Sequence, residues 1–187
     1  MTRHLPMKSV NLIVPEKQTT ALDFEIDKLT NSIENVVSGE SFSTQLIRLS
    51  RADLKNLRKK GGWLFNWKNE LESLDCEVYK LVIPSNPDVV HGVISLTFKT
   101  DHVAINLLES SSINRGKGKL YHGVAGNLVA FACSLSFQRG HEGNVAFTAK
   151  TKLIEHYTDT LGAVHIGSGR MIITSANAKK LIDNYFR

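Results

Sequence analysis

A turn of small residues, Gly123-Val124-Ala125-Gly126, stands directly before the apolar segment 127–135. Small residues let a turn's backbone approach a phosphate group closely. The start of a helix adds unpaired N–H donors and a partial positive charge from the aligned peptide dipoles. The turn, with His122 and Asn127 beside it, is therefore a candidate to bind a phosphate or pyrophosphate. A plain glycine turn before a core helix is the other interpretation.

Other phosphate-binding patterns fit the chain less well. No Gly-x-x-x-x-Gly-Lys-Ser/Thr is present, which excludes a P-loop, and the Gly-x-Gly at 116–118 lacks the third glycine of a dinucleotide fingerprint. The stretch RGKGK (115–119) places Arg115, Lys117 and Lys119 just before the turn. These cations could meet an anionic ligand, or the stretch is a solvated loop.

Composition limits the class of protein. The chain has 187 residues, 42% of them hydrophobic, and a formal net charge of +5. This predicts one globular domain, with room for a small appendage. No apolar run is long enough for a membrane span and the N-terminus lacks a signal-peptide pattern, so we expect a cytoplasmic protein without a membrane partner.

Cysteine and histidine usage gives no sign of a metal site. Cys76 and Cys133 are expected to be reduced and buried, and the histidines are scattered without ligand spacing, so no metal is predicted. The basic stretch 51–60 raises the question of nucleic acid. The aromatic pattern of RNA-binding strands is missing, so a nucleic-acid partner is not favoured.

Hydrophobic periodicity predicts the elements that must position the turn. Residues 10–14 indicate a short strand, and an apolar residue every three or four positions predicts a helix over 20–38. Further strands are predicted at 43–51, 76–84, 89–100, 101–110, 144–150 and 170–175, and helices at 52–62, 63–74, 125–138, 151–162 and 176–186. This order predicts a mixed α/β domain over 43–187 with helices packed on one sheet. Residues 1–42 form an N-terminal extension of strand and amphipathic helix packed on that domain.

The segment NVAFTAKTKLIEHYTDTLGA (144–163) gives a strand, a helix that carries Tyr157, and then Leu-Gly-Ala. With the strand, glycine turn and helix before it, this order resembles the GCN5-related N-acetyltransferase (GNAT) superfamily. In that family an Arg/Gln-x-x-Gly-x-Gly/Ala turn binds the pyrophosphate of acetyl-coenzyme A, and a later helix carries a tyrosine. The resemblance covers 43–187 and implies the acyl-CoA N-acyltransferase fold, a mostly antiparallel mixed sheet with helices on both faces.

The resemblance also implies roles for individual residues. Acetyl-coenzyme A would be the cosubstrate and would lie between the strands at 101–110 and 144–150. Tyr157 would be the general acid and Glu109 the base. Backbone near Leu107 and Leu108 would pair with the pantetheine arm. The pyrophosphate would be bound by Lys119, His122, Gly123, Val124, Ala125, Gly126 and Asn127.

Two positions depart from the family pattern. Leu120 stands at the Arg/Gln position, where Lys119 would have to take over the polar contact, and Ala163 stands where an aromatic residue is usual.

The function that follows is transfer of an acetyl group to a primary amine of a small molecule or protein by direct attack. A non-catalytic acyl-CoA-binding or interaction module on the same fold is the alternative, as is a nucleic-acid-associated acetyltransferase. The sequence does not identify the amine acceptor, and it allows either a monomer or a homodimer.

Overall fold

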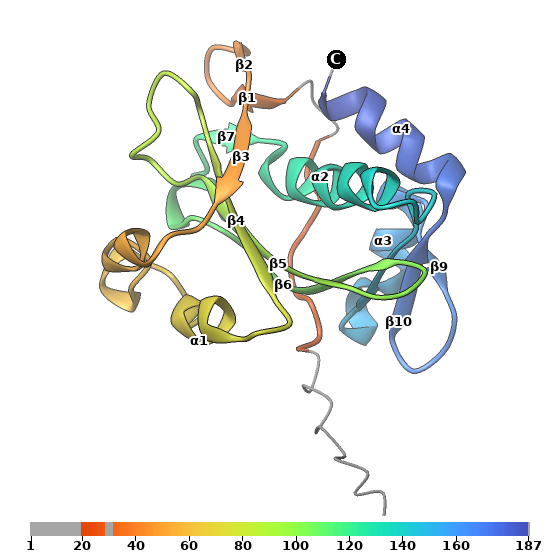
Figure 1. Cartoon of the computed structure of the whole chain (residues 1–187). Helices are drawn as coiled ribbons and strands as arrows, with labels where there is room; N and C mark the ends of the chain where they lie inside the picture. Colours follow the sequence, from red (N-terminus) through yellow and green to blue (C-terminus); the bar gives the residue numbers. More distant parts are fainter. Residues whose placement is uncertain (1–19, 29–31, 187) are drawn as a thin grey trace, which may run out of the picture.

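The computed structural model describes residues 20–28 and 32–186 (Figure 1). A seven-stranded sheet with the order β3-β4-β5-β6-β8-β10-β9 forms its centre. The strands are β3 (Gln45–Arg48), β4 (Glu77–Val82), β5 (Gly92–Phe98), β6 (Val103–Ser110), β8 (Val145–Thr148), β9 (Val164–His165) and β10 (Arg170–Ile173). Neighbours are antiparallel except β6 and β8, which are parallel. Parallel neighbours need a long crossover, which α2 (Val124–Gln138) supplies.

A smaller sheet has the order β2-β1-β7. Its strands are β1 (Ile33–Asn35), β2 (Ser41–Phe42) and β7 (Tyr121–His122). Because β7 leads directly into α2, this sheet joins the N-terminal part of the chain to the turn singled out above.

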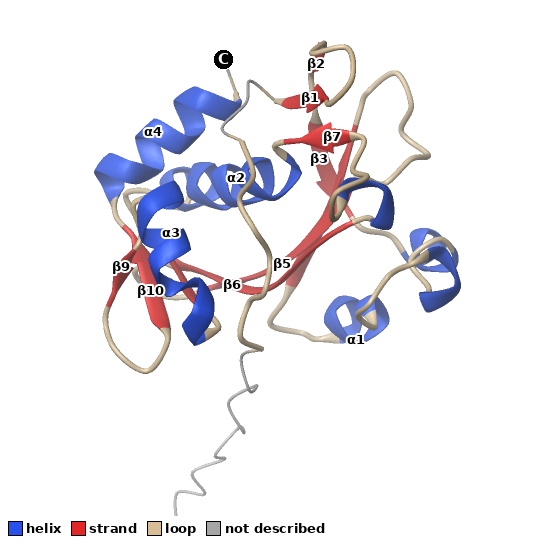
Figure 2. Ribbon diagram, turned by 180° about the vertical axis from the view of Figure 1, so that it is seen from behind, coloured by secondary structure: helices blue, strands red, loops and turns tan. Residues whose placement is uncertain are grey.

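Helices cover both faces of the main sheet (Figures 1 and 2). On one face lie α2, α3 (Ile154–Leu161) and α4 (Ser175–Tyr185). On the other lie α1 (Trp67–Glu72) and the short 3₁₀ helices η1 (Arg51–Lys55) and η2 (Lys59–Gly61). Two further 3₁₀ turns, η3 (Ser112–Asn114) and η4 (Thr151–Leu153), precede β7 and α3.

Each face has its own core. β6 serves both, because successive side chains of a strand point to opposite faces. Leu108 belongs to the larger core under α2, whereas Leu107 belongs to the smaller core with Trp63 and Trp67. Most of the residues of α2 are buried, since the sheet covers one side of the helix and α4 another.

The strands and helices predicted from residue 76 onward are confirmed in type and order. The helix predicted over 52–62 is wrong in kind, because Arg58 is extended (φ −107°, ψ 157°) and splits the segment into η1 and η2. The helix predicted over 63–74 is confirmed only over Trp67–Glu72. Among the described residues, no helix has the length and apolarity to cross a bilayer.

The helix predicted over 20–38 is wrong. Residues 20–28 are extended, and residues 33–35 form β1; residues 29–31 and the strand predicted at 10–14 lie outside the described residues. The apolar positions Leu22, Phe24 and Ile26 also alternate with a period of two, which suits an extended chain, and Leu22 and Ile26 are buried. The same residues fit both helical spacing and strand alternation, and the contact of Leu22 with the end of β8 favours the extended form.

Candidate functional site

Strands β6 and β8 diverge within the sheet. Their parallel register covers only two pairs, Val103 with Val145 and Ala104 with Ala146, and β6 then continues to Ser110 beside β5 alone. The β5–β6 register shifts between Ser95 and Leu96, whose partners are Leu107 and Ile105. Asn106 is thus an extra, bulged residue of β6. Such a bulge bends the strand, and this one lies where the two strands begin to separate.

Residues 20–28, the N-terminal segment, meet the end of β8 at the edge that this divergence exposes. Leu22 forms a parallel bridge with Ala149. Its N–H donates to the Thr148 carbonyl at 2.7 Å, and its own carbonyl accepts from the Lys150 N–H at 3.1 Å. Figure 2 shows the segment as a tan line that passes α3 and the strands before it reaches the level of α2. One parallel bridge therefore joins the chain's own N-terminal segment to this edge.

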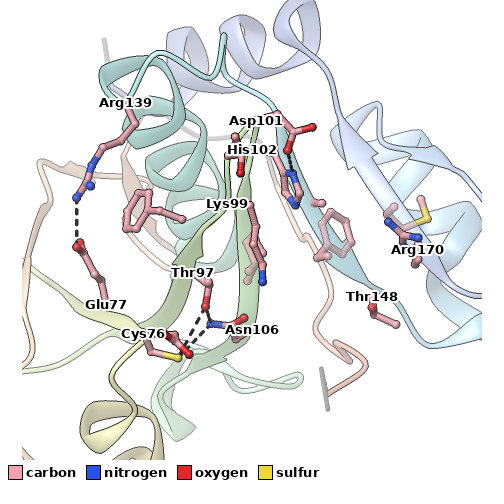
Figure 3. A pocket seen from close by; sticks show the side chains of 18 of the residues that line it. Cys76, Glu77, Thr97, Lys99, Asp101, His102, Asn106, Arg139, Thr148 and Arg170 are labelled. Carbon is pink, nitrogen blue, oxygen red and sulfur yellow. Dashed lines mark hydrogen bonds and ion pairs between the residues drawn. The ribbon is translucent and has the colours of Figure 1, made fainter. Parts of the chain in front are cut away.

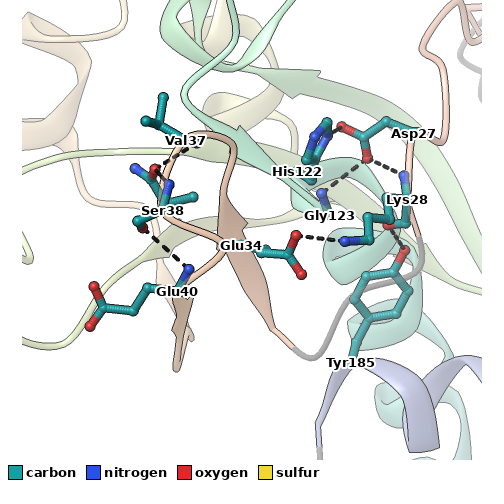
Figure 4. Close-up of polar contacts among 10 residues, drawn as sticks. Asp27, Lys28, Glu34, Val37, Ser38, Glu40, His122, Gly123 and Tyr185 are labelled. Carbon is teal, nitrogen blue, oxygen red and sulfur yellow. Dashed lines mark hydrogen bonds and ion pairs between the residues drawn. The ribbon is translucent and has the colours of Figure 1, made fainter.

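The turn before α2 binds an anion, and the anion belongs to the N-terminal segment. Gly123 is the N-cap of α2 with φ +87°, and its N–H donates to Asp27 Oδ1 at 3.0 Å (Figure 4). Lys119 Nζ lies 3.0 Å and His122 Nδ1 3.3 Å from Asp27 Oδ2. Burial alone would raise the pKa of Asp27, but hydrogen bonds from the Gly123 and Lys28 N–H groups and from Lys119 hold that pKa below its usual value.

The remaining turn residues are buried. The first intrahelical bond runs from the Asn127 N–H to the Gly123 carbonyl at 2.9 Å, so the N–H groups of residues 124–126 precede it and have no partner within the helix. Gly126 faces α4: a Cβ there would lie 1.8 Å from the Tyr185 hydroxyl oxygen. The side chain of Asn127 accepts from Thr44 Oγ1 at 3.2 Å.

Tyr157 points from α3 toward the N-terminal segment and is fully buried. Its hydroxyl donates to the Phe24 carbonyl at 2.6 Å and accepts from the Phe24 N–H at 3.2 Å. The neighbouring His156 accepts the Ile26 N–H on Nε2 at 2.8 Å, which requires that nitrogen to be unprotonated. Burial raises the pKa of Tyr157 well above its usual value, so the phenol keeps its proton.

Glu109 lies in a different environment from Tyr157. Its carboxylate accepts from the Leu64 N–H at 2.6 Å, from Trp67 Nε1 at 2.9 Å and, more loosely, from the Phe65 N–H at 3.4 Å. Arg115 Nη1 lies 3.1 Å from the same carboxylate, and its other nitrogen donates to a backbone carbonyl at Gly62. These contacts tie the segment before α1 to β6, so the structure does not bring the two predicted catalytic residues together.

The three cations before α2 have different surroundings. Arg115 is engaged with Glu109, Lys119 is engaged with Asp27, and Lys117 is exposed. Leu120, at the family's Arg/Gln position, is 47% exposed. Because its side chain has no hydrogen-bond donor, any side-chain polar contact at the turn must come from neighbouring residues. Leu107 and Leu108 pair with Ser95 and Ile94 of β5.

An open cleft of about 1120 Å³ lies on the sheet (Figure 3). Its floor includes the residues at which β6 and β8 diverge: Ala104, Ile105, Asn106, Ala146, Phe147 and Thr148. Asn106 Nδ2 donates to Thr97 Oγ1 at 2.8 Å and lies 3.4 Å from the Cys76 thiol. Charges of both signs, including Glu77, Asp101, Arg139 and Arg170, line the rim.

Sequence reasoning missed Asp27, Phe24 and His156. The alternation of Leu22, Phe24 and Ile26 was the available signal for an extended segment, but its destination at α2 and α3 is not encoded locally. Neither Cys76 nor Cys133 forms a disulfide; Cys133 is buried as expected, whereas Cys76 is half-buried. In the described part of the chain no three His, Cys, Asp or Glu residues come together as a metal site.

Comparison with known proteins gives structural likeness alone. No family model and no curated protein matches the chain. A mutant form of the spermidine/spermine N-acetyltransferase SpeG from Vibrio cholerae aligns with a TM-score of 0.51 and 14% identity over 74% of this chain and 98% of that chain. A chimera of spermidine N-acetyltransferase SpeG from Vibrio cholerae and hSSAT aligns with a TM-score of 0.53 and 15% identity, covering 74% and 99%.

The mostly antiparallel mixed sheet with helices on both faces matches the fold of these proteins. The chain therefore has the acyl-CoA N-acyltransferase fold of the GCN5-related N-acetyltransferases, as its sequence predicted.

Proposed function

We propose that the protein transfers an acetyl group from acetyl-coenzyme A to a primary amine. The observation that carries the proposal is the course of the N-terminal segment, which contacts in turn the groups that would bind the cosubstrate. An extended chain with backbone amides pairs with the edge of β8, passes the Tyr157 hydroxyl and ends in an anion at the start of α2. Pantetheine is likewise an extended chain with amide groups that ends in a pyrophosphate, so the donors and acceptors on this path suit it.

The anionic end would lie at the turn before α2. The Gly123 N–H and the Lys119 ammonium already bind a carboxylate there, and a pyrophosphate offers more charge to the same donors. The N–H groups of residues 124–126 precede the first intrahelical bond and add donors from the same turn. The pyrophosphate would therefore bind at the predicted turn, where Lys119 would make the polar contact that Leu120 cannot make.

The chemistry is direct transfer. A neutral amine attacks the carbonyl carbon of the thioester, the tetrahedral intermediate collapses, and the C–S bond breaks. The leaving thiolate gains a proton, for which the Tyr157 phenol is the candidate donor because burial keeps it protonated. The amine nitrogen loses a proton, which returns to Tyr157 through water and balances the step. Since four donors surround Glu109, we infer that this carboxylate anchors the segment before α1 and is not the base.

The amine would reach the thioester from the cleft. The cleft contacts the diverging ends of β6 and β8, and the side chain of Phe147 there packs against Tyr157 with ring centroids 5.3 Å apart. Spermidine and spermine, the amines named for the structural neighbour, are the first acceptors to try.

The test is a turnover assay on the full chain with acetyl-coenzyme A and a panel of primary amines that starts with spermidine. We expect release of the coenzyme A thiol together with an acetylated amine in the mass spectrum. Calorimetry supplies the cofactor affinity, with Lys119→Glu expected to weaken binding about tenfold and Lys117→Glu, two residues away and exposed, to change it by about twofold or less. No heat of binding at millimolar acetyl-coenzyme A would contradict the proposal.

One observation favours a second candidate. The Tyr157 hydroxyl and the Gly123 N–H are both engaged by the chain's own N-terminal segment, which suits a binding or interaction module without turnover. Cofactor binding without thiol release across the amine panel would select this alternative.

A further inference from the structure

The N-terminal segment contacts every element that the proposed function assigns to acyl-coenzyme A. Leu22 pairs with the end of β8, Phe24 bonds to Tyr157 of α3, and Asp27 caps the turn before α2. These three contacts follow one another along six residues. Because the proposed mechanism places the thioester sulfur at Tyr157, the stretch from Phe24 to Asp27 runs in the order of the ligand, from thioester through pantetheine to pyrophosphate.

The segment and the ligand compete for the same atoms. A single N–H at Gly123 donates to Asp27, and the one hydroxyl proton of Tyr157 is donated to the Phe24 carbonyl. The backbone bonds of Leu22 use the Thr148 carbonyl and the Lys150 N–H at the exposed edge of β8. Both occupants cannot use these groups at once, so binding of one requires release of the other.

We propose that residues 22–27 are an autoinhibitory strap, an internal mimic of acyl-coenzyme A that the cosubstrate must displace before the enzyme works. The inference rests on the proposed function and specifies the regulation of the same site. When the strap is in place, the phenol of Tyr157 is withheld from chemistry and the anion-binding turn is filled.

The strap's charges make it displaceable by a polyanion. It carries Asp23, Glu25 and Asp27 in alternation, and the first and last of these meet lysines. Asp23 pairs with Lys150 and with Lys152, the latter at 3.2 Å, where its side chain is 36% exposed. The phosphates of coenzyme A bring more negative charge than one carboxylate to the lysine at the turn, whereas the burial of Leu22 and Ile26 holds the strap closed in their absence.

The experiment titrates coenzyme A, which binds without turnover, into the full chain by calorimetry. Three variants are compared with the wild type: Asp27→Asn and Leu22→Ala weaken the strap at its two ends, and Asp159→Asn removes a carboxylate from an exposed position on α3. We expect the two strap variants to bind coenzyme A about fivefold or more tightly than wild type, and Asp159→Asn to bind within about twofold. Leu22→Ala leaves the charge unchanged, so its effect cannot come from electrostatic attraction alone.

Hydrogen exchange on the wild-type chain gives a readout that needs no variant. Saturating coenzyme A should speed amide exchange in the peptide covering 22–27 while slowing it over 123–127. Tight binding with unchanged or slower exchange over 22–27 would overturn the strap and leave the proposed function standing. No binding to the wild type or to either strap variant would overturn both.

Discussion

At the scale of single residues, removal of the Tyr157 hydroxyl should affect turnover and cosubstrate binding in opposite directions. Its hydroxyl holds Phe24 of the N-terminal segment, and it is also the candidate proton donor. In Tyr157→Phe we therefore expect kcat to fall about a hundredfold or more while the Kd for acetyl-coenzyme A stays the same or falls. Steady-state kinetics combined with calorimetry measures both quantities.

Tyr79 offers the matched control for this change. It lies on β4 and donates its hydroxyl to Glu77 at 2.6 Å, and burial with that carboxylate raises its pKa to about 12. Tyr79→Phe removes the same atom from a partly buried phenol, and kcat should change by about twofold or less. Equal losses in the two variants would count against a proton-donor role for Tyr157.

The contacts of Glu109 predict a structural phenotype. Glu109→Gln keeps the shape but removes the charge that faces Arg115 and one of two acceptor oxygens. Leaving that guanidinium partly buried without its partner should lower the free energy of unfolding by about 3 kcal/mol, as measured by urea denaturation. The control is Glu72→Gln, an exposed carboxylate whose ion pairs are loose, with an expected change of about 0.5 kcal/mol or less.

The alternative role for Glu109 gives a different pattern. If the carboxylate were the base, Glu109→Gln would stay stable and lose turnover. Intact stability with that kinetic change would restore the assignment made from the resemblance.

At the scale of elements, the packing of α4 on α2 explains one residue of the predicted turn. A Cβ at Gly126 would clash with the Tyr185 hydroxyl oxygen at 1.8 Å, so Gly126→Ala should push the helices apart and cost about 2 kcal/mol or more of stability. Thermal and urea denaturation measure the loss. Gly118→Ala, with open space around its Cβ, should stay within about 0.5 kcal/mol. A stable Gly126→Ala protein that no longer binds acetyl-coenzyme A would instead assign the glycine to the ligand.

The sequence predicts well those elements whose signals are local. The strands from residue 76 onward and the helix after Gly123 follow from alternation, helical spacing and turn residues within each segment. The helix at 20–38 was wrong because Leu22 and Ile26 satisfy both the helical and the extended period. The contacts that keep the segment extended come from distant parts of the chain; the one between Asp27 and Gly123 spans 96 positions. The glycine turn and Tyr157 were therefore predictable as candidates, but what occupies the site was not.

At the scale of the whole molecule, the N-terminal segment and the cleft both reach the place where β6 and β8 diverge, but from different sides. The N-terminal segment lies beside α2 and α3, in the larger core. The cleft lies over the same strands. Ala146 and Thr148 line it and alternate along β8 with Val145, a core residue that does not line it, whereas Phe147 belongs to the core and also borders the cleft. This alternation places the cleft on the opposite face of β8 from the segment. Cosubstrate and amine would thus enter from opposite faces and meet at the divergence.

This arrangement predicts that the cleft can be blocked without affecting the cosubstrate. Ala146→Trp puts an indole on the cleft floor, and we expect the KM for the amine to rise about tenfold while the Kd for acetyl-coenzyme A changes by about twofold or less. Val37→Trp adds the same side chain at a position that is 93% exposed beyond β1, and both constants should stay as in the wild type. Equal weakening of both ligands in Ala146→Trp would mean that they share one face. An unchanged KM for the amine would remove the cleft from the acceptor path, because a bulky ring on its floor cannot leave a bound amine undisturbed.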